Sequence, residues 1–213
     1  MPTVTALLPQ PRRKDRVNLF LDSAFAFPLH KKLAQEAGLF IGQELAEADI
    51  RALEHQATLR FALDIAYRFL ALRPRTEAEI RTRLRRGRVA AELTERVVAR
   101  LKEQRLLDDV AFAHQWAEHR AASSPRSRSL VRHELQLKGI GQELAQEAVL
   151  ELDDEEAAYQ AGARRVTRLK VQDHQEFRKR LWDFLRRRGF GYNVITITIE
   201  RLWRERVETA DSE

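Results

Sequence analysis

The stretch IRTRLRRGRVAAELTERVVARL (residues 80–101) recurs as VRHELQLKGIGQELAQEAVLEL (131–152) and as LWDFLRRRGFGYNVITITIERL (181–202). In each copy two apolar residues lie four apart, and a third follows thirteen residues after the first. A basic residue followed by a glycine separates the two halves of every copy. Apolar residues four apart share one face of a helix, and glycine commonly ends a helix, so each copy predicts two short helices joined by a tight turn.

A helical pattern also precedes each copy, at residues 59–72, 110–119 and 155–169. Each repeat therefore predicts a three-helix, helix-turn-helix-like module, and three modules follow one another at a spacing of 50 to 51 residues. The predicted fold is mostly α-helical, with the modules laid end to end in an elongated array.

One segment conflicts with this interpretation. Residues 194–199 alternate with a period of two and are rich in β-branched side chains. Their propensity alone favours a strand. We expect a helix, because Val194 and Leu202 keep the phase of the repeat and Gly191 suits the position before a helix.

The N-terminal quarter follows a different pattern. Residues 1–15 hold three prolines and no apolar periodicity, which predicts a disordered lead-in. Residues 17–21 and 25–29 alternate in hydrophobicity around Asp22-Ser23, which predicts a β-hairpin that ends at Pro28. The apolar face of one long helix predicted at 48–73 holds Ile65, Phe69 and Leu72.

These patterns divide the chain into consecutive segments. We expect a lead-in at 1–15, a hairpin with a short helix at 16–50, three-helix modules at 51–107, 108–152 and 153–207, and an acidic tail at 208–213.

Composition excludes several classes of protein. The 213 residues include no Cys, so disulfide scaffolds, thiolate metal sites and cysteine nucleophiles are excluded. No apolar run approaches the roughly 18 residues that span a bilayer, and we expect a soluble cytoplasmic protein. His114 and His119 are five apart, not the four of a helical zinc pair, and Asp108-Asp109 suits a helix N-cap. We therefore predict no enzyme activity, no metal and no cofactor.

Positive charge is concentrated near the turns of the modules. Residues 73–106 carry 11 basic and 5 acidic side chains. Carboxylates four residues away can neutralise a cation on the same helix, as we expect of Glu77 for Arg81, Glu134 for Lys138 and Asp183 for Arg187. The turn cations without such a partner are Arg85, Arg86, Arg88, Arg126, Arg128, Arg132, Arg186 and Arg188. Each of these alone is best explained as a solvated helix-end charge, whereas their recurrence at three turns predicts an extended acidic or polyanionic partner. The candidate binding residues are Arg81, Arg85, Arg86, Arg88, Arg126, Arg128, Arg132, Lys138, Arg186, Arg187 and Arg188.

A helix-turn-helix protein can instead read duplex DNA through polar side chains on one helix of each module. The third helices here carry carboxylates, which repel phosphate, so sequence-specific recognition is disfavoured and a weak, salt-sensitive DNA affinity stays open. The carboxylates are Glu92, Glu95, Glu143, Glu147 and Glu151. Trp182, next to the apolar position Leu181, is the aromatic residue that we expect to contact a partner.

Several ordered motifs resemble the RecX family between about residues 16 and 203. They are Arg75-Thr76-Glu77-Ala78-Glu79-Ile80 with Leu84, Leu106-Leu107-Asp108-Asp109 with Phe112-Ala113, Val131-Arg132-His133-Glu134-Leu135 with Lys138-Gly139-Ile140, and Arg187-Arg188-Gly189-Phe190 with Tyr192. The chain departs from the family pattern in three places. The first module is one residue short between Leu84 and Gly87, Ser127 and Ser129 stand where Gly-Pro is common, and Ser23 replaces a favoured turn glycine.

The resemblance implies a regulator of the RecA recombinase, active in homologous recombination, DNA repair and the SOS response. Such relatives lie in the groove of the RecA–DNA filament and depress filament growth, ATP hydrolysis, strand exchange and co-protease action, with no catalytic residue. We expect a monomer that binds this filament and contacts single-stranded or duplex DNA weakly, without sequence specificity. The alternative is a tandem helix-turn-helix DNA-binding or architectural protein with no recombinase partner.

Overall fold

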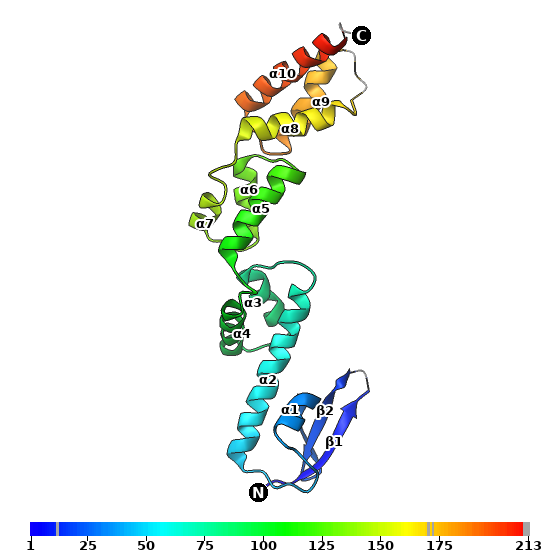
Figure 1. Cartoon of the computed structure of the whole chain (residues 1–213), viewed down its shortest axis with the longest axis vertical. Helices are drawn as coiled ribbons and strands as arrows, with labels where there is room; N and C mark the ends of the chain where they lie inside the picture. The colour runs from blue at the N-terminus through cyan, green and yellow to red at the C-terminus, as the bar shows by residue number, and fades with distance from the viewer. Residues whose placement is uncertain (12, 170, 172, 211–213) are drawn as a thin grey trace. The chain divides into compact units, whose positions relative to one another are not determined.

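The computed structural model describes residues 1–11, 13–169, 171 and 173–210. Figure 1 draws the helices and strands, coloured from blue at the N-terminus to red at the C-terminus. The chain divides into two compact units. The first comprises Met1–Arg75 and Ile80–Leu107, and the second comprises Thr76–Glu79 and Asp108–Glu213. The end of the predicted acidic tail, 211–213, lies outside the described residues. The finer division into modules ending at 107, 152 and 207 remains a prediction of the sequence.

An antiparallel sheet opens the first unit, with strands β1 (Val4–Gln10), β2 (Arg13–Leu21) and β3 (Ala24–His30) in that order. The predicted hairpin is therefore present as β2 and β3. The disordered lead-in predicted at 1–15 is wrong, because β1 pairs with β2 and buries Val4 completely. Proline lowers the strand propensity of this segment, so the sequence did not predict β1, although an edge strand tolerates proline.

The hairpin differs in detail from its prediction. Pro28 lies inside β3, opposite Asn18, and not at its end. Because β3 is an edge strand, the missing N–H of proline interrupts no second ladder. Asp22 and Ser23 both adopt positive φ angles, of 45° and 66°, as a primed hairpin turn requires.

Helices α1 (Lys31–Glu36) and α2 (Glu47–Leu70) follow the sheet. The first half of α2 packs against the sheet through Leu53 and Ala57, whereas its second half contributes Ala62 and Ile65 to the next core. One helix thus serves two hydrophobic cores within the first unit. Leu72, predicted on its apolar face, lies beyond its end and is 78% exposed.

Three-helix modules make up the remainder, and each has its own hydrophobic core. The first combines α2 with α3 (Glu77–Arg86) and α4 (Ala91–Glu103). The others consist of α5 (Asp109–Ser123), α6 (Arg128–Leu137) and α7 (Gln142–Glu147), and of α8 (Asp154–Val166), α9 (His174–Arg186) and α10 (Tyr192–Ala210). The paired apolar positions of all three repeats are fully buried: Ile80, Leu84, Val131, Leu135, Leu181 and Leu185.

The ambiguous segment 194–199 is helical, within α10, as the repeat phase predicts. Ile195 and Ile199 lie one turn apart and are 1% and 2% exposed, whereas Ile197 is 52% exposed, so one face of the segment is buried, as in an amphipathic helix. Thr198, which interrupts the apolar pattern, is also buried, at 3% exposure. Tertiary burial has overridden the local strand propensity here.

The turns between the second and third helices share one geometry. The amide of Val89, Ile140 or Phe190 bonds back to the carbonyl of Leu84, Leu135 or Leu185 respectively, which closes a left-handed helix end. Gly139 and Gly189 occupy the left-handed position, at φ 85° and 83°.

The expected glycine cap of the first module is wrong. The left-handed position lies four residues after the buried leucine in all three turns, but in this module the glycine comes one residue earlier, so the position falls on Arg88, at φ 58°, and not on Gly87. Gly87 remains closely packed, since a Cβ there would lie 3.2 Å from Cδ1 of Ile65.

In the second unit, the start of a middle helix twice meets the turn of the following module. The backbone N–H of Ser127, the N-cap of α6, donates to the carbonyl of Arg188 at 2.9 Å. Similarly, Thr76 Oγ1 donates to the carbonyl of Lys138 at 2.6 Å. A Cβ on Gly189 would lie 2.5 Å from Ser127 Oγ, so these contacts leave no room for a side chain at the turn.

Candidate partner-binding surface

The turn after α3 presents the cations of the first unit. Arg85, Arg86 and Arg88 are exposed, and their side chains form no ion pair with any described residue. Cations at a helix C-terminus are stabilised by the helix dipole, which explains why several positive charges can gather at the end of α3. These three side chains remain available to an anionic partner.

Arg81 is positioned differently from its neighbours on α3. Its guanidinium forms a bidentate pair with Glu95 of α4, with Nε–Oε1 and Nη2–Oε2 distances of 2.9 Å. Hydrogen bonding to Arg81 lowers the pKa of the Glu95 carboxyl below its ordinary value. Arg81 therefore crosslinks two helices of its own module.

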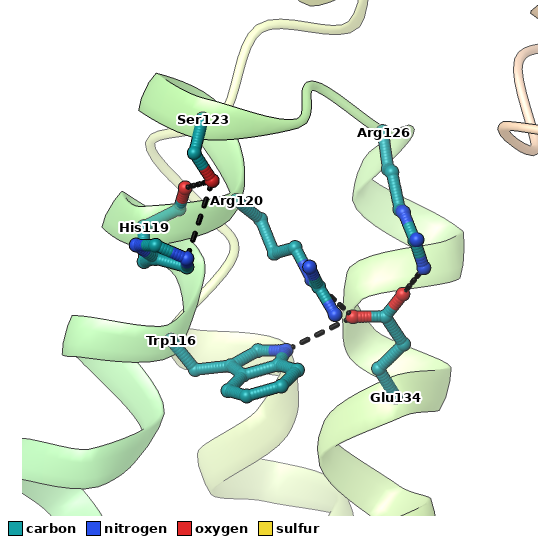
Figure 2. Close-up of polar contacts among 6 residues, drawn as sticks. All are labelled: Trp116, His119, Arg120, Ser123, Arg126 and Glu134. Atoms are coloured by element: carbon teal, nitrogen blue, oxygen red, sulfur yellow. Dashed lines mark hydrogen bonds and ion pairs between the residues drawn. The ribbon is translucent and has the colours of Figure 1, made fainter.

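Glu134 of α6 organises the polar surface of the second module (Figure 2). Its carboxylate accepts hydrogen bonds from Trp116 Nε1 at 3.0 Å and from Arg120 Nε at 2.7 Å, and its second oxygen pairs with Arg126. The Glu134 side chain is only 13% exposed. Arg126, predicted to be unpaired, is therefore neutralised by an acid eight residues away, a spacing that an i,i+4 count does not test.

The indole of Trp116 adds a second kind of contact. Arg120 lies 4.4 Å from the ring centroid, and the Lys138 ammonium lies 4.1 Å from it. Cations at this range are attracted by the electrons of the ring face. Lys138 thus lies against the module surface and is not a freely projecting charge.

Arg128 and Arg132 donate hydrogen bonds to neutral oxygens, so their side chains are held in place although neither forms an ion pair with a described residue. Arg128 Nε donates to the carbonyl of Leu152 at 3.0 Å, and Arg132 Nη1 donates to Gln146 Oε1 at 2.7 Å. Both partners lie beyond α6 in the chain, where local spacing gives no signal. Arg132 borders a polar groove of about 390 Å³ with Gln136, Gln142, Glu143 and Gln146.

The turn after α9 presents the cations of the third module. Arg186 and Arg187 are exposed and, within the described part of the chain, form no ion pair. Arg188 instead stacks on Phe184, 3.8 Å from its centroid, and Arg165 of α8 lies over the same ring at 5.6 Å. Sequence reasoning missed Arg165, because the ring that it covers belongs to a different helix.

Arg188 is electrostatically unusual. Its Nε is buried and finds no hydrogen-bond acceptor among the described residues. Burial, followed by the positive charges of Arg126, Arg187 and Arg165, lowers the pKa of Arg188 below its ordinary value. Several cations therefore converge here without a matching carboxylate among the groups that act on Arg188.

The third helices do not resemble helices that read a DNA groove. Helix α7 is six residues long, and the carboxylates predicted to repel phosphate are exposed. Trp182 is half-buried and packs edge-on against Tyr192, at 5.1 Å between centroids, whereas Tyr192 itself is 66% exposed. The exposed aromatic surface of this module is thus carried mainly by Tyr192.

The described residues include neither a candidate membrane-spanning helix nor a candidate metal-binding cluster. No helix in this part of the chain combines the length and apolar character needed to cross a bilayer. No group of three or more His, Asp or Glu side chains within the same ranges is arranged to hold a metal ion.

Family models match the chain in an uninterrupted order. The RecX N-terminal domain matches residues 2–46, and the first, second and third RecX three-helix domains match 62–101, 108–149 and 153–199. The chain belongs to the RecX family. Its mostly helical architecture, with three three-helix domains behind an N-terminal sheet, is the fold that the sequence predicts.

RecX relatives align with between 65% and 98% of the chain in two examples. The regulatory protein RecX of Lactobacillus gasseri is 28% identical over 212 residues, which cover 98% of this chain and 78% of the relative. That of Chlorobium limicola is 35% identical over 138 residues, covering 65% and 87%.

Solved RecX structures share the fold. A crystal structure of regulatory protein RecX superposes with a TM-score of 0.64 at 24% identity, covering 94% of this chain and all of that one. RecX from Lactobacillus salivarius gives a TM-score of 0.58 at 19% identity, over 68% and 96%.

Proposed function

We propose that this RecX-family protein binds the RecA–DNA filament in the cytoplasm and inhibits the recombinase without catalysing a reaction. The observation that carries the proposal is the complete succession of RecX domains along the chain. On this account the protein limits filament growth and depresses ATP hydrolysis, strand exchange and co-protease action, and so acts in recombination, DNA repair and the SOS response.

The charges at the module turns support a binding role. Arg85, Arg86 and Arg88 gather at one exposed turn without ion-pair partners among the described residues. The surface of a nucleoprotein filament offers phosphates and carboxylates, both of which a guanidinium can bind through two hydrogen bonds. Arg186 and Arg187 repeat this arrangement at the corresponding turn of the third module, next to the half-buried Arg188.

Co-sedimentation with RecA filaments on single-stranded DNA tests the proposal. We expect the wild-type chain to pellet with the filaments and to shorten them at stoichiometric ratios. Reversal of Arg85, Arg86 and Arg88 to Glu should weaken co-sedimentation at least roughly tenfold, since each lost charged contact costs about 1 kcal/mol or more. The melting temperature should stay nearly unchanged, because these side chains are exposed.

A matched control is the reversal of Arg178, Lys179 and Arg204, which are also exposed and change the net charge by the same amount. Equal losses in both triple variants would mean that net charge alone governs binding. If the wild type fails to co-sediment but binds duplex DNA tightly and with sequence preference, the alternative of a tandem DNA-binding protein is favoured.

A further inference from the structure

The second and third modules place equivalent cations around different central residues. Arg120 and Arg165 each lie twelve residues after the aspartate that caps their helix, and Lys138 and Arg188 each precede the turn glycine. One residue differs in kind between the two modules. It is Glu134, which precedes Leu135, in the second module and Phe184, which precedes Leu185, in the third. The repeat therefore substitutes an aromatic ring for a carboxylate at the centre of a basic cluster.

The substitution removes the internal counter-charge. In the second module Glu134 neutralises Arg120 and Arg126 directly (Figure 2). In the third module Arg165 and Arg188 lie over Phe184, which holds them through its ring face but carries no charge. The two guanidinium groups are thus held near an uncharged ring, and neither forms an ion pair with a described residue.

The contact between these two modules brings a further cation to the same place. Ser127 N–H donates to the carbonyl of Arg188, so the preceding residue, Arg126, lies next to the Arg188 turn. Arg187 follows the end of α9 at that turn and is exposed. The buried Nε of Arg188 has no acceptor among the described residues, which leaves its guanidinium incompletely bonded.

We propose that Arg165, Arg187 and Arg188, which lie beside Arg126 and its partner Glu134, form a binding site for a phosphodiester group of single-stranded nucleic acid. A guanidinium held against a ring face loses much of its orientational freedom and can still donate two hydrogen bonds to the oxygens of one phosphate. A single phosphate can accept from two guanidinium groups at once, and a continuous backbone supplies a further phosphate to Arg187. This site deepens the proposed function and rests on it, since the nucleic acid within the filament is the polyanion concerned.

The test is the binding of a fluorescent oligothymidylate to the full chain without recombinase, followed by anisotropy at several salt concentrations. Phe184→Glu restores the carboxylate of the second module without removing any arginine, and Arg165→Gln removes one exposed cation. We expect each to weaken binding roughly three- to tenfold and to reduce the salt dependence by about one phosphate contact, or about 0.7 in the logarithmic slope. The matched control is Arg178→Gln, an exposed charge of α9 outside the cluster that changes the net charge by the same single unit.

Each outcome decides the proposal. Losses for Phe184→Glu and Arg165→Gln that exceed those of Arg178→Gln support the site. Equal losses in all three variants, or no measurable oligonucleotide binding by the wild type, contradict it. Competition by oligoglutamate as effective as that by oligothymidylate of equal charge would assign the site to an acidic peptide and would also overturn it.

Folding and the proposed function are controlled separately. Phe184 packs against the core of its module, so thermal melts must accompany Phe184→Glu, and the exposed Arg165→Gln keeps the test valid if that variant unfolds. Since recombinase is absent from this assay, loss of RecA inhibition would leave the oligonucleotide result intact. Conversely, a negative oligonucleotide result would leave inhibition of RecA open to its own test.

Discussion

Glu134 shows how much one carboxylate can determine at the residue scale. It neutralises Arg120 and Arg126 and orients the indole of Trp116 from a largely buried position (Figure 2). Removing one partner from a buried charge network leaves the remaining cations without compensation, which costs more than the pair contributes. Glu134 and its partners therefore form a structural charge network in the second module and not a free basic patch.

We expect Glu134→Ala to lower the free energy of unfolding by about 2 to 3 kcal/mol, somewhat less than for a fully buried pair because both arginines are partly exposed. Urea denaturation provides the measurement. The control is Glu103→Ala, whose partner Arg100 is exposed, and which should change stability by less than about 0.5 kcal/mol. Similar values for both variants would show that Glu134 does not hold a network.

Arg88 combines a strained backbone with an exposed charge. Its positive φ is costly for a residue with a Cβ, so Arg88→Gly should stabilise the chain by about 1 kcal/mol while removing a candidate binding cation. Arg85→Gly removes an equivalent cation from within α3 and should destabilise by about 0.5 to 1 kcal/mol. Thermal melts distinguish the two signs, and destabilisation by Arg88→Gly would mean that its side chain makes a contact that outweighs the strain.

At the scale of elements, the turns define where one module meets the next within the second unit. Gly189 combines a positive φ with the close approach of Ser127 and Leu130, whereas Gly42 has a similar φ of 92° and open space around it. The first glycine is constrained by backbone and packing, and the second by backbone alone. This pair separates the two causes experimentally.

We expect Gly42→Ala to cost about 1 kcal/mol, from backbone strain alone. Gly189→Ala should cost about 2 kcal/mol or more beyond that, because its Cβ would lie 2.5 Å from Ser127 Oγ and 2.9 Å from Leu130 Cβ. Hydrogen exchange would show the loss at amides of α6 and α9. Equal costs for the two substitutions would indicate that the contact between the modules yields freely.

Helices were predictable from the sequence wherever the spacing of apolar residues recurred at the same place in each repeat. The paired positions such as Leu135 and Leu185 identify the modules, and Asp108 caps α5 as its sequence context predicts. Strand β1 was missed because prolines suppress its propensity, while its burial depends on pairing with β2. The left-handed position falls on Arg88 because the glycine of the first turn lies one residue earlier than those of the other two turns.

The candidate site was less predictable than the fold, for a physical reason. Charge pairing within one helix follows from spacing, but Arg126, Arg128 and Arg132 find partners on other segments. Arg165 joined the third-module cluster only through a ring on a neighbouring helix. Side chains as long as arginine can reach many surfaces, so their partners depend on tertiary packing.

At the scale of the whole molecule, the central proposal is that this RecX-family chain inhibits RecA. The decisive measurement is the rate of ATP hydrolysis by RecA on single-stranded DNA as the full chain is added up to a stoichiometric ratio. The account predicts a progressive fall in that rate, which reversal of Arg85, Arg86 and Arg88 to Glu largely abolishes. An unchanged rate at every ratio, from a chain that is folded by circular dichroism, would contradict it.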